Sequence, residues 1–360
     1  MILATPGLTP RISAPDHIRC NPSLTEVVVV CACDDRYAMP LNVMLHSAAT
    51  TLDPGSRLTV YFLDGGLSQS SWDCLGRTLQ DLPIDVLSVQ PDYSLVEHLH
   101  TSHHVTPAAY LRLLTAELMP ETVGRVIYLD SDLLVCEDLT GLWNLPLDHH
   151  YCLAAADIAC PWIDARVGCA NRKKAIPYLA ALNPVPNWQR LGLDPSAPYF
   201  NSGVMVLNLH RWREDQVAVR MLECLETHRK HVWCWDQYAL NVMFHGQWGR
   251  LPARWNQGAH SLEFPTVEHS PIDPGEFSEM LENPAIVHFT TEFKPWHFHW
   301  QHLRGEEFFT ALDRTSFRGW RPERPPFSWR RWQQRQGMYL AKWLVTNYRR
   351  ITAVWGGPAA

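Results

Sequence analysis

The sequence predicts an α/β protein with a doubly wound, mostly parallel central sheet. Short continuous apolar runs alternate with segments of helical periodicity over residues 25–135, which is the pattern of strands buried on both faces by crossover helices. Acidic residues follow several of these runs, at the strand ends where ligands bind in such sheets. With 360 residues, 46% of them hydrophobic and 19% charged, the chain has the composition of an ordinary globular protein.

The elements can be placed in order from these patterns. The first predicted strands are four apolar runs: TEVVVVCACDD (25–35), RLTVYFLDGG (57–66), IDVLSV (84–89) and RVIYL (125–129). Helices are predicted between them: Leu41–Ala48, Ser68–Leu82 with Ser68 as its N-cap, and Pro107–Leu118 with proline at its start. Further strands are predicted later in the chain: Tyr151–Ala156, Val204–Leu209 and Ala285–Phe289.

The chain divides into three predicted parts. Residues 1–24, rich in Pro, Ser and Thr, are expected to be irregular, and residues 25–315 form the main domain. Within that domain the Pro-rich stretch 159–198 is interpreted as an irregular insertion, a common form for a substrate-binding loop. Residues 316–360 form a separate tail.

The tail and the body carry opposite charge. Residues 316–360 contain eight Arg and one Lys against the single acid Glu323, or about +8, which leaves about −14 for residues 1–315. Five tryptophans are interleaved with the basic residues of the tail: Trp320, Trp329, Trp332, Trp343 and Trp355. A tail with its own charge and aromatic content is expected to have its own partner.

Cysteine usage and hydropathy indicate the compartment. The ten cysteines form no C-x-x-C pair and no repeating framework, which favours a reducing, cytoplasmic environment over disulfides or a zinc site. The N-terminal residues lack the pattern of a secretory signal, and no stretch is long and apolar enough to be expected to span a membrane.

Two carboxylates follow the buried run RVIYL, at Asp130 and Asp132. Unpaired carboxylates in that position would cost several kcal/mol, so a cation is expected beside them. Hard oxygen ligands suit Mn²⁺ or Mg²⁺, which keep coordination places for diphosphate oxygens. The alternative is a helix N-cap with a surface acid, and this motif alone does not decide between the two.

A second segment supports the metal interpretation. The run AIVHFTTEFKPWH places His288 at the end of another apolar strand, with Lys294 six residues later. An imidazole can complete a divalent site, and it suits Mn²⁺ better than Mg²⁺. A lysine ammonium could neutralise a leaving diphosphate. Taken alone, however, His288 could equally be a core histidine with satisfied hydrogen bonds.

Six segments, in order and spacing, resemble glycosyltransferase family 8. They are CDDRYAMPLNVMLHSA, HVTPAAYLRLL, RVIYLDSDLLV, YFNSGVMVLNLHRW, WDQYALN and HFTTEFKPW. This retaining family includes bacterial lipopolysaccharide galactosyl- and glucosyltransferases and, more distantly, glycogenin. The resemblance covers about residues 25–300. It implies a nucleotide-sugar-binding domain of the GT-A type over residues 25–315, UDP-sugar donors and dependence on Mn²⁺.

The resemblance also implies roles for individual residues. The metal ligands would be Asp130, Asp132 and His288, and Lys294 would bind the diphosphate. Ala32 and Asp34 would contact the uridine. Residues implied near the donor phosphate and sugar are His104, Arg112, Ser131, Asn201 and Ser202. In the D-Q pair, Asp236 would hold sugar hydroxyls and Gln237 would face the anomeric carbon, with Asp157 as a further catalytic candidate.

Two departures from the family pattern concern the edges of this site. Arg36 stands where relatives often have Asn, which would alter base or ribose contacts. Between His288 and Lys294, many relatives carry a glycine that approaches the phosphate, whereas this chain has Thr290, Thr291 and Glu292. We interpret these changes as affecting donor choice or the closing loop, because the three metal ligands are intact.

The expected activity is transfer of galactose or glucose from UDP to a glycan acceptor, with retention. Gln237 is an amide and a poor nucleophile, so attack by the acceptor on the face from which UDP leaves is favoured over double displacement. Asp157 is the reserve nucleophile. Two rival classes are a UDP-sugar-binding module with weakened catalysis and a sugar nucleotidyltransferase. The second needs a Gly-rich phosphate loop, and an oxidoreductase needs G-x-G-x-x-G; the first strand is followed by neither.

For the tail, Trp, Tyr, Leu and Arg recur at roughly helical spacing over Ser328–Trp355. This pattern favours a helix lying on an anionic membrane surface, with a lipopolysaccharide or other lipid-linked acceptor on the cytoplasmic face. A helix packed on the acidic body is the alternative. A nucleic-acid partner is not expected, since no RNA-binding motif accompanies the tail.

Overall fold

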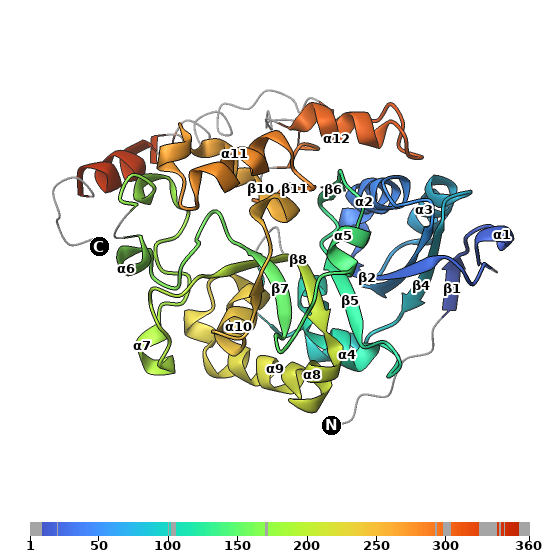
Figure 1. Cartoon of the computed structure of the whole chain (residues 1–360), viewed down its shortest axis with the longest axis horizontal. Coiled ribbons are helices and arrows are strands. Elements are labelled where there is room, and N and C mark those ends of the chain that lie inside the picture. The colour runs from blue at the N-terminus through green and yellow to red at the C-terminus, as the bar shows by residue number, and fades with distance from the viewer. Residues whose placement is uncertain are drawn as a thin grey trace.

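The computed structural model describes residues 9–19, 21–99, 101, 106–169, 172–291, 294–297, 304–323, 337, 340–341 and 343–352. Its main feature is a large sheet whose fifth strand continues into a small one (Figure 1). The large sheet has the order β1-β4-β3-β2-β5-β8-β7-β9. Its strands are β1 Thr9–Ile12, β2 Thr25–Cys33, β3 Ser56–Asp64, β4 Ile84–Val89, β5 Arg125–Leu129, β7 Cys152–Ala156, β8 Phe200–Asn208 and β9 Gly249–Arg250.

The four strands β4-β3-β2-β5 are parallel, so the predicted parallel core of the sheet is confirmed. Strand β8 runs antiparallel to both β5 and β7, and β1 is antiparallel to β4. The sequence does not reveal these directions, because a strand buried on both faces has the same apolar composition whichever way it runs.

The predicted strands and helices are present with small shifts at their ends. The α-helices are α1 Asp16–Arg19, α2 Ala38–Thr50, α3 Gln69–Leu79, α4 Thr115–Leu118, α5 Thr140–Trp143, α6 Ala165–Gly168, α7 Trp188–Leu191, α8 Leu209–Glu214, α9 Val217–Thr227, α10 Trp235–Met243, α11 Pro274–Glu282 and α12 Gly305–Leu312. Short 3₁₀ turns join them: η1 Asp35–Tyr37, η2 Tyr93–Leu95, η3 Pro107–Leu114, η4 Ile176–Tyr178, η5 Arg229–His231, η6 Ala253–Asn256, η7 Ala259–Glu263 and η8 Val267–His269. The helix predicted at Pro107–Leu118 is therefore a 3₁₀ segment followed by one α turn.

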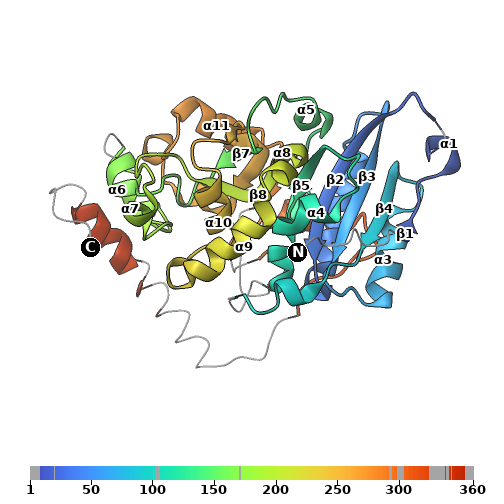
Figure 2. The same ribbon diagram turned by 90° about the horizontal axis from the view of Figure 1, so that it is seen from below.

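Both faces of the sheet are covered. Along β2, Val28 and Val30 pack into one apolar cluster with helices α8, α9 and α10, whereas Val27 and Val29 pack into another with α2 and α3. Figure 1 shows these two groups of helices on opposite sides of the strands, and Figure 2 shows α8 to α10 from below. Burial on both faces explains why the strands read as continuous apolar runs.

The small sheet has the order β10-β11-β6, with β10 Gln257–Gly258, β11 Ile286–His288 and β6 Leu133–Val135. Only Asp130, Ser131 and Asp132 separate β5 of the large sheet from β6 of the small one. Strand β11 is antiparallel to β6, and His288 pairs with Leu133. This register brings the end of β11 beside the D-S-D turn, across more than 150 residues of chain.

Two predicted boundaries differ from the structure. Residues 1–24 were expected to be irregular, but they contain β1, which adds an edge strand to the sheet, and α1. The tail was expected to separate at residue 316, but the Ser316 hydroxyl donates to the Cys74 carbonyl at 2.6 Å and its N–H to the Thr78 hydroxyl at 3.0 Å. Ser316 is thus part of the body.

Residues 340–341 and 343–352 of the tail are helical. The Arg349 guanidinium donates to the Leu179 carbonyl, which places this helix beside the 159–198 insertion, near α6 in both views (Figures 1 and 2). Exposed apolar side chains of the helix are Leu340, Trp343, Leu344, Val345, Tyr348 and Ile351. Trp329, Trp332 and Trp355 lie outside the described residues. In the described part of the chain, no helix has the length and apolar character that crossing a bilayer requires.

Candidate active site

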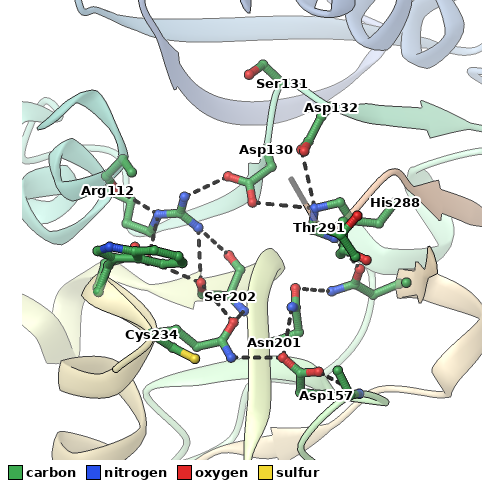
Figure 3. Close-up of a pocket in the computed structure, with 18 of the residues that line it drawn as sticks. Arg112, Asp130, Ser131, Asp132, Asp157, Asn201, Ser202, Cys234, His288 and Thr291 are labelled. Carbon is green, nitrogen blue, oxygen red and sulfur yellow. Dashed lines mark hydrogen bonds and ion pairs between the residues drawn. The ribbon is translucent and has the colours of Figure 1, made fainter. Parts of the chain in front are cut away.

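The D-S-D turn and the end of β11 form a cluster of three ligand atoms. His288 Nε2 lies 3.3 Å from Asp132 Oδ1 and 3.7 Å from Asp130 Oδ2, and one ligand atom of each residue lies within 4.8 Å of the others. Figure 3 shows the three side chains converging. The Asp130 N–H donates to the Gly203 carbonyl at 2.8 Å, which ties the turn to β8.

The ring of His288 is oriented by Asn256. His288 Nδ1 lies 2.8 Å from Asn256 Oδ1, and the Asn256 amide nitrogen donates to Asn201 Oδ1 at 2.9 Å. An amide oxygen only accepts, so Nδ1 carries the proton in this network. The other ring nitrogen, Nε2, faces the two carboxylates, and in the neutral ring it would offer a lone pair to a cation held between them. Such a set of lone pairs fits a divalent cation, with Asn256 as its outer partner.

Lys294 supplies one positive charge to this cluster. Its Nζ donates to Asp132 Oδ2 and to the Phe289 carbonyl, both at 2.6 Å. Although burial by itself raises the pKa of Asp132, Lys294 and His288 together hold that pKa well below its ordinary value. Asp132 is therefore an anion and available as a ligand.

Arg112 supplies the second positive charge and joins three segments. Its guanidinium donates to Asp130 Oδ1 at 2.7 Å and lies 3.1 Å from Asp236 Oδ2, and it donates to the Ser202 carbonyl at 2.9 Å. Burial raises the pKa of Asp236 above its ordinary value, and Arg112 opposes that rise. Arg112 thus fixes the D-S-D turn, the start of β8 and the start of α10 relative to one another.

A chain of hydrogen bonds continues from the cluster into the floor of the cavity. Asp157 Oδ2 accepts from Gln237 Nε2 at 2.9 Å and from Asn201 Nδ2 at 3.1 Å, and Asp157 Oδ1 accepts from the Ala159 N–H at 2.8 Å. Gln237 Oε1 accepts from the Ser202 N–H at 3.1 Å. With both ends of its amide bonded, Gln237 has a fixed orientation.

Gly203 allows strand β8 to lie close to His288 and Asp130. A Cβ at that position would lie 2.3 Å from His288 Cε1 and 2.8 Å from Asp130 Oδ2. Both are too short for any side chain to be accommodated without moving a ligand. The glycine after Asn201 and Ser202 is therefore required by the close packing of β8 against the cluster.

These residues line one cavity of about 570 Å³. Five carboxylates form part of its wall: Asp34 at one end, and Asp130, Asp132, Asp157 and Asp236 around the cluster. Of the described lining residues, Arg112 and Lys294 are the permanent cations, so the carboxylates outnumber these cations by three. A divalent cation would balance two of these negative charges.

The other end of the cavity is lined by Ala32, Asp34 and Tyr37. Asp34 caps the turn η1 by accepting from the Arg36 N–H at 3.1 Å, and its carboxylate pairs with the Arg36 guanidinium at 3.3 Å. Arg36, noted from the sequence as a departure, therefore acts on Asp34 directly.

Ser131, Thr290 and Thr291 were also singled out from the sequence, and the structure shows their positions. Ser131 is buried and its hydroxyl points away from the two carboxylates (Figure 3). Thr290 accepts from the Ala259 N–H at 2.8 Å, and Thr291 has φ of 76°, a left-handed conformation that is strained for a β-branched residue. His104 and Glu292 lie outside the described residues.

Neither Asn256 nor Trp233 was predicted from the sequence to belong to the site. Asn256 belongs to a short 3₁₀ turn between two strands of two residues each, so no periodicity marks it. Trp233 lines the cavity with half of its side chain exposed. A tryptophan three residues before the D-Q pair was the available signal for it.

Comparison with known proteins gives one family. The model of the family described as "Glycosyl transferase family 8" matches residues 28–299. General stress protein A of Bacillus subtilis is 29% identical over 293 residues, covering 81% of this chain and 94% of that protein. Glycosyltransferase GlyF of Streptococcus pneumoniae is 24% identical over 269 residues, covering 74% of this chain and 56% of that protein.

A solved structure shows the same fold. The crystal structure of the galactosyltransferase LgtC in complex with donor and acceptor sugar analogs superimposes with a TM-score of 0.63 at 23% identity, covering 84% of this chain and 99% of that chain. This likeness confirms the predicted GT-A arrangement.

Proposed function

That the chain belongs to glycosyltransferase family 8 is the premise from which we propose a specific activity. The protein transfers a hexose, galactose or glucose, from a UDP-sugar to a glycan acceptor and retains the configuration at the anomeric carbon. The observation that carries the proposal is the convergence of Asp130, Asp132 and His288 on one wall of a cavity that also holds Lys294 and the D-Q pair.

The three converging residues would hold Mn²⁺, with Mg²⁺ as the alternative, and the imidazole favours Mn²⁺. When bound, the ion would neutralise the diphosphate and stabilise UDP as it leaves. Two of its ligands come from one turn and the third from a strand held in register with that turn, so the positions of the ligands are set before the donor arrives.

Lys294 is proposed to bind the diphosphate from the protein side. Its ammonium is bonded to Asp132 and to a carbonyl, and these contacts fix it beside the metal ligands. A cation held in that position stabilises the negative charge that grows on the departing phosphate, which is the largest contribution expected of such a site.

The donor sugar is proposed to lie over Asp236, Gln237 and Asp157, with Asn201 and Ser202 beside them. Asp157 accepts three hydrogen bonds from the protein, which spread its charge and make it a weak nucleophile. Gln237, an amide held at both ends, is weaker still. This supports attack by the acceptor hydroxyl on the face that UDP leaves, without a covalent intermediate.

Uridine is proposed to bind at the Ala32 and Asp34 end of the cavity, with Asp34 accepting from the uracil N–H. The Arg36 guanidinium already pairs with Asp34, so in this protein the base contact would include both side chains. His104 remains a proposed phosphate or sugar contact.

The tail is proposed to hold the enzyme on an anionic membrane on the cytoplasmic side, facing a lipopolysaccharide or other lipid-linked acceptor. Arg349 is directed to the body, whereas Leu340, Leu344, Tyr348 and Ile351 are exposed. They follow at spacings of three or four residues, which is one stripe of a helix. An apolar stripe directed away from the body, with basic residues in the same tail, suits a lipid interface.

A panel of UDP-sugars tests the proposed function. UDP release is measured with UDP-galactose, UDP-glucose and UDP-N-acetylglucosamine, in Mn²⁺ and in EDTA. We expect Mn²⁺-dependent release from one of the two hexoses. Binding of UDP-sugar without release from any of them would instead support the weakened binding module, and release that is equal in EDTA would contradict the metal assignment.

A further inference from the structure

The cavity has a deep floor and a shallow rim. Asp157, Asp236 and Gln237 on the floor are 5–9% exposed, so the donor sugar that they are proposed to hold would be largely enclosed. More exposed residues that line the cavity are Ala180 of the 159–198 insertion, His260 and Trp233, and we call them its rim. No donor contact accounts for these rim residues.

Trp233 stands out at this rim. The residue is 53% exposed although it lines the cavity, and it lies just before α10, which carries the D-Q pair. Within the part of the chain that the structure describes, no hydrogen bond and no aromatic or cation contact engages its ring. An aromatic ring that is half exposed at the edge of a cavity can cover the apolar face of a ligand bound there.

The backbone after Trp233 constrains the position of this residue. Trp235, two residues later, has φ of 43°, a conformation that costs about 1–3 kcal/mol for a residue other than glycine and is found where the surrounding structure enforces it. Asp236, the next residue, is anchored by Arg112 and by Ser202. The position of Trp233 is thus constrained by the anchored side chain of Asp236, three residues later.

We propose that Trp233 is the stacking platform of an acceptor subsite for a pyranose ring. This inference rests on the proposed function. One face of a β-linked galactose or glucose ring presents several C–H groups, and the electron-rich face of an indole attracts them while it shields them from water. The ring hydroxyls remain free at the edges, where His260 also lines the cavity.

The acceptor, rather than the donor, fits this position. The donor is fixed at its diphosphate by the cluster of carboxylates and Lys294, and its sugar lies on the enclosed floor. The attacking hydroxyl must come from a second molecule that enters from the open side, where Trp233 is exposed. Stacking sets the plane of that molecule and so decides which hydroxyl reaches the anomeric carbon.

The test compares Trp233→Ala and Trp233→Phe with Trp320→Ala, the matched control. Trp320 is 39% exposed and is not among the residues that line the cavity. UDP release is measured without acceptor, with methyl β-D-galactopyranoside, lactose and cellobiose, and with glycerol, a hydroxyl acceptor without a ring.

For Trp233→Ala we expect the half-saturating concentration of the ring acceptors to rise about tenfold, and to rise by a larger factor than that of glycerol. The half-saturating concentration for Trp233→Phe should lie between those of Trp233→Ala and the wild type. Trp320→Ala should behave as the wild type. Equal use of ring acceptors by Trp233→Ala and the wild type would overturn the proposal. So would a wild type that hydrolyses a UDP-sugar but whose UDP release no pyranoside raises above that hydrolysis.

Binding separates this inference from the proposed function. Saturation-transfer NMR with methyl β-D-galactopyranoside reports on ring contact whether or not a UDP-sugar is turned over. If no UDP-sugar is hydrolysed, the proposed function fails, and the subsite stands only if saturation of the sugar C–H protons is present in the wild type and lost in Trp233→Ala.

Discussion

At the scale of single residues, the surroundings of His288 explain its role better than its position in the sequence does. The apolar run before it and Lys294 after it suggested a metal ligand but fitted a core histidine as well. Asn256 supports the proposed ligand role, because it accepts from Nδ1 and leaves Nε2 facing Asp130 and Asp132. The convergence of Asp130, Asp132 and His288 could thus be predicted from the sequence, whereas Asn256, which orients the imidazole, could not.

We expect Asn256→Ala to lower the affinity for Mn²⁺ by about 10- to 100-fold, the usual effect of removing an outer hydrogen bond to a metal-bound histidine. Asn256→Asp keeps an acceptor for Nδ1–H and should retain most of the affinity. Calorimetric titration with Mn²⁺ measures both variants. Equal affinity in Asn256→Ala and the wild type would show that the histidine is oriented by something else.

Thr291 offers a prediction about strain. The left-handed conformation at φ of 76° costs about 1–3 kcal/mol for a non-glycine residue, and glycine avoids that cost while it adds up to about 1 kcal/mol of entropy to the unfolded chain. Thr291→Gly should therefore raise the free energy of unfolding by about 1 kcal/mol.

The control for this prediction is Thr310→Gly, in the interior of α12, which should lower the free energy of unfolding by a few tenths of a kcal/mol. Urea denaturation compares the two variants with the wild type. A loss of stability in Thr291→Gly as large as that in Thr310→Gly would mean that Thr291 is not strained.

At the scale of elements, most strands and helices were predictable because each is an apolar run of distinct period. The direction of β8 was not. The small sheet was predicted only in part: β11 corresponds to the predicted strand Ala285–Phe289, whereas its partners β6 and β10 have three and two residues and no clear pattern. These short strands nevertheless determine where side chains of the candidate active site lie. Their register places His288 opposite Leu133, and β8 passes behind them at Gly203.

The packing of β8 against the cluster predicts that Gly203→Ala reduces Mn²⁺ affinity more than tenfold while the protein stays folded. The added methyl group would meet His288 and Asp130 at distances far below van der Waals contact and push the ligands apart. Gly76→Ala in α3 is the matched control, because nothing lies within 4 Å of its added methyl group.

The control should bind Mn²⁺ as the wild type does and gain about 0.5–1 kcal/mol of stability. Circular dichroism establishes that both variants are folded before the titration. If Gly203→Ala binds Mn²⁺ normally, β8 does not constrain the metal ligands in the way that the structure suggests.

At the scale of the whole molecule, the opposite charges of body and tail were visible in the sequence, but the point where they separate was not. The composition changes near residue 316, whereas the fold continues, because Ser316 bonds to α3 and Arg321 pairs with Asp313 at 2.7 Å. A truncation that tests the tail should therefore end at residue 323.

The full-length chain is expected to float with vesicles of phosphatidylglycerol and phosphatidylcholine, and the chain 1–323 is expected to stay in solution. Each basic residue near an anionic surface contributes about 1 kcal/mol, so high salt should weaken the binding of the full-length chain. Flotation of both chains, or of neither, would contradict the assignment of the tail to a membrane surface.

The most direct test of the whole account is Mn²⁺ binding and Mn²⁺-dependent UDP release, measured together in the wild type, Asp130→Asn, Asp132→Asn and His288→Ala. We predict that the wild type binds a single ion with UDP present and turns over a UDP-hexose only with that ion, and that each variant loses both properties. Undiminished turnover in any of the variants would contradict the central claim that these three side chains share one cation.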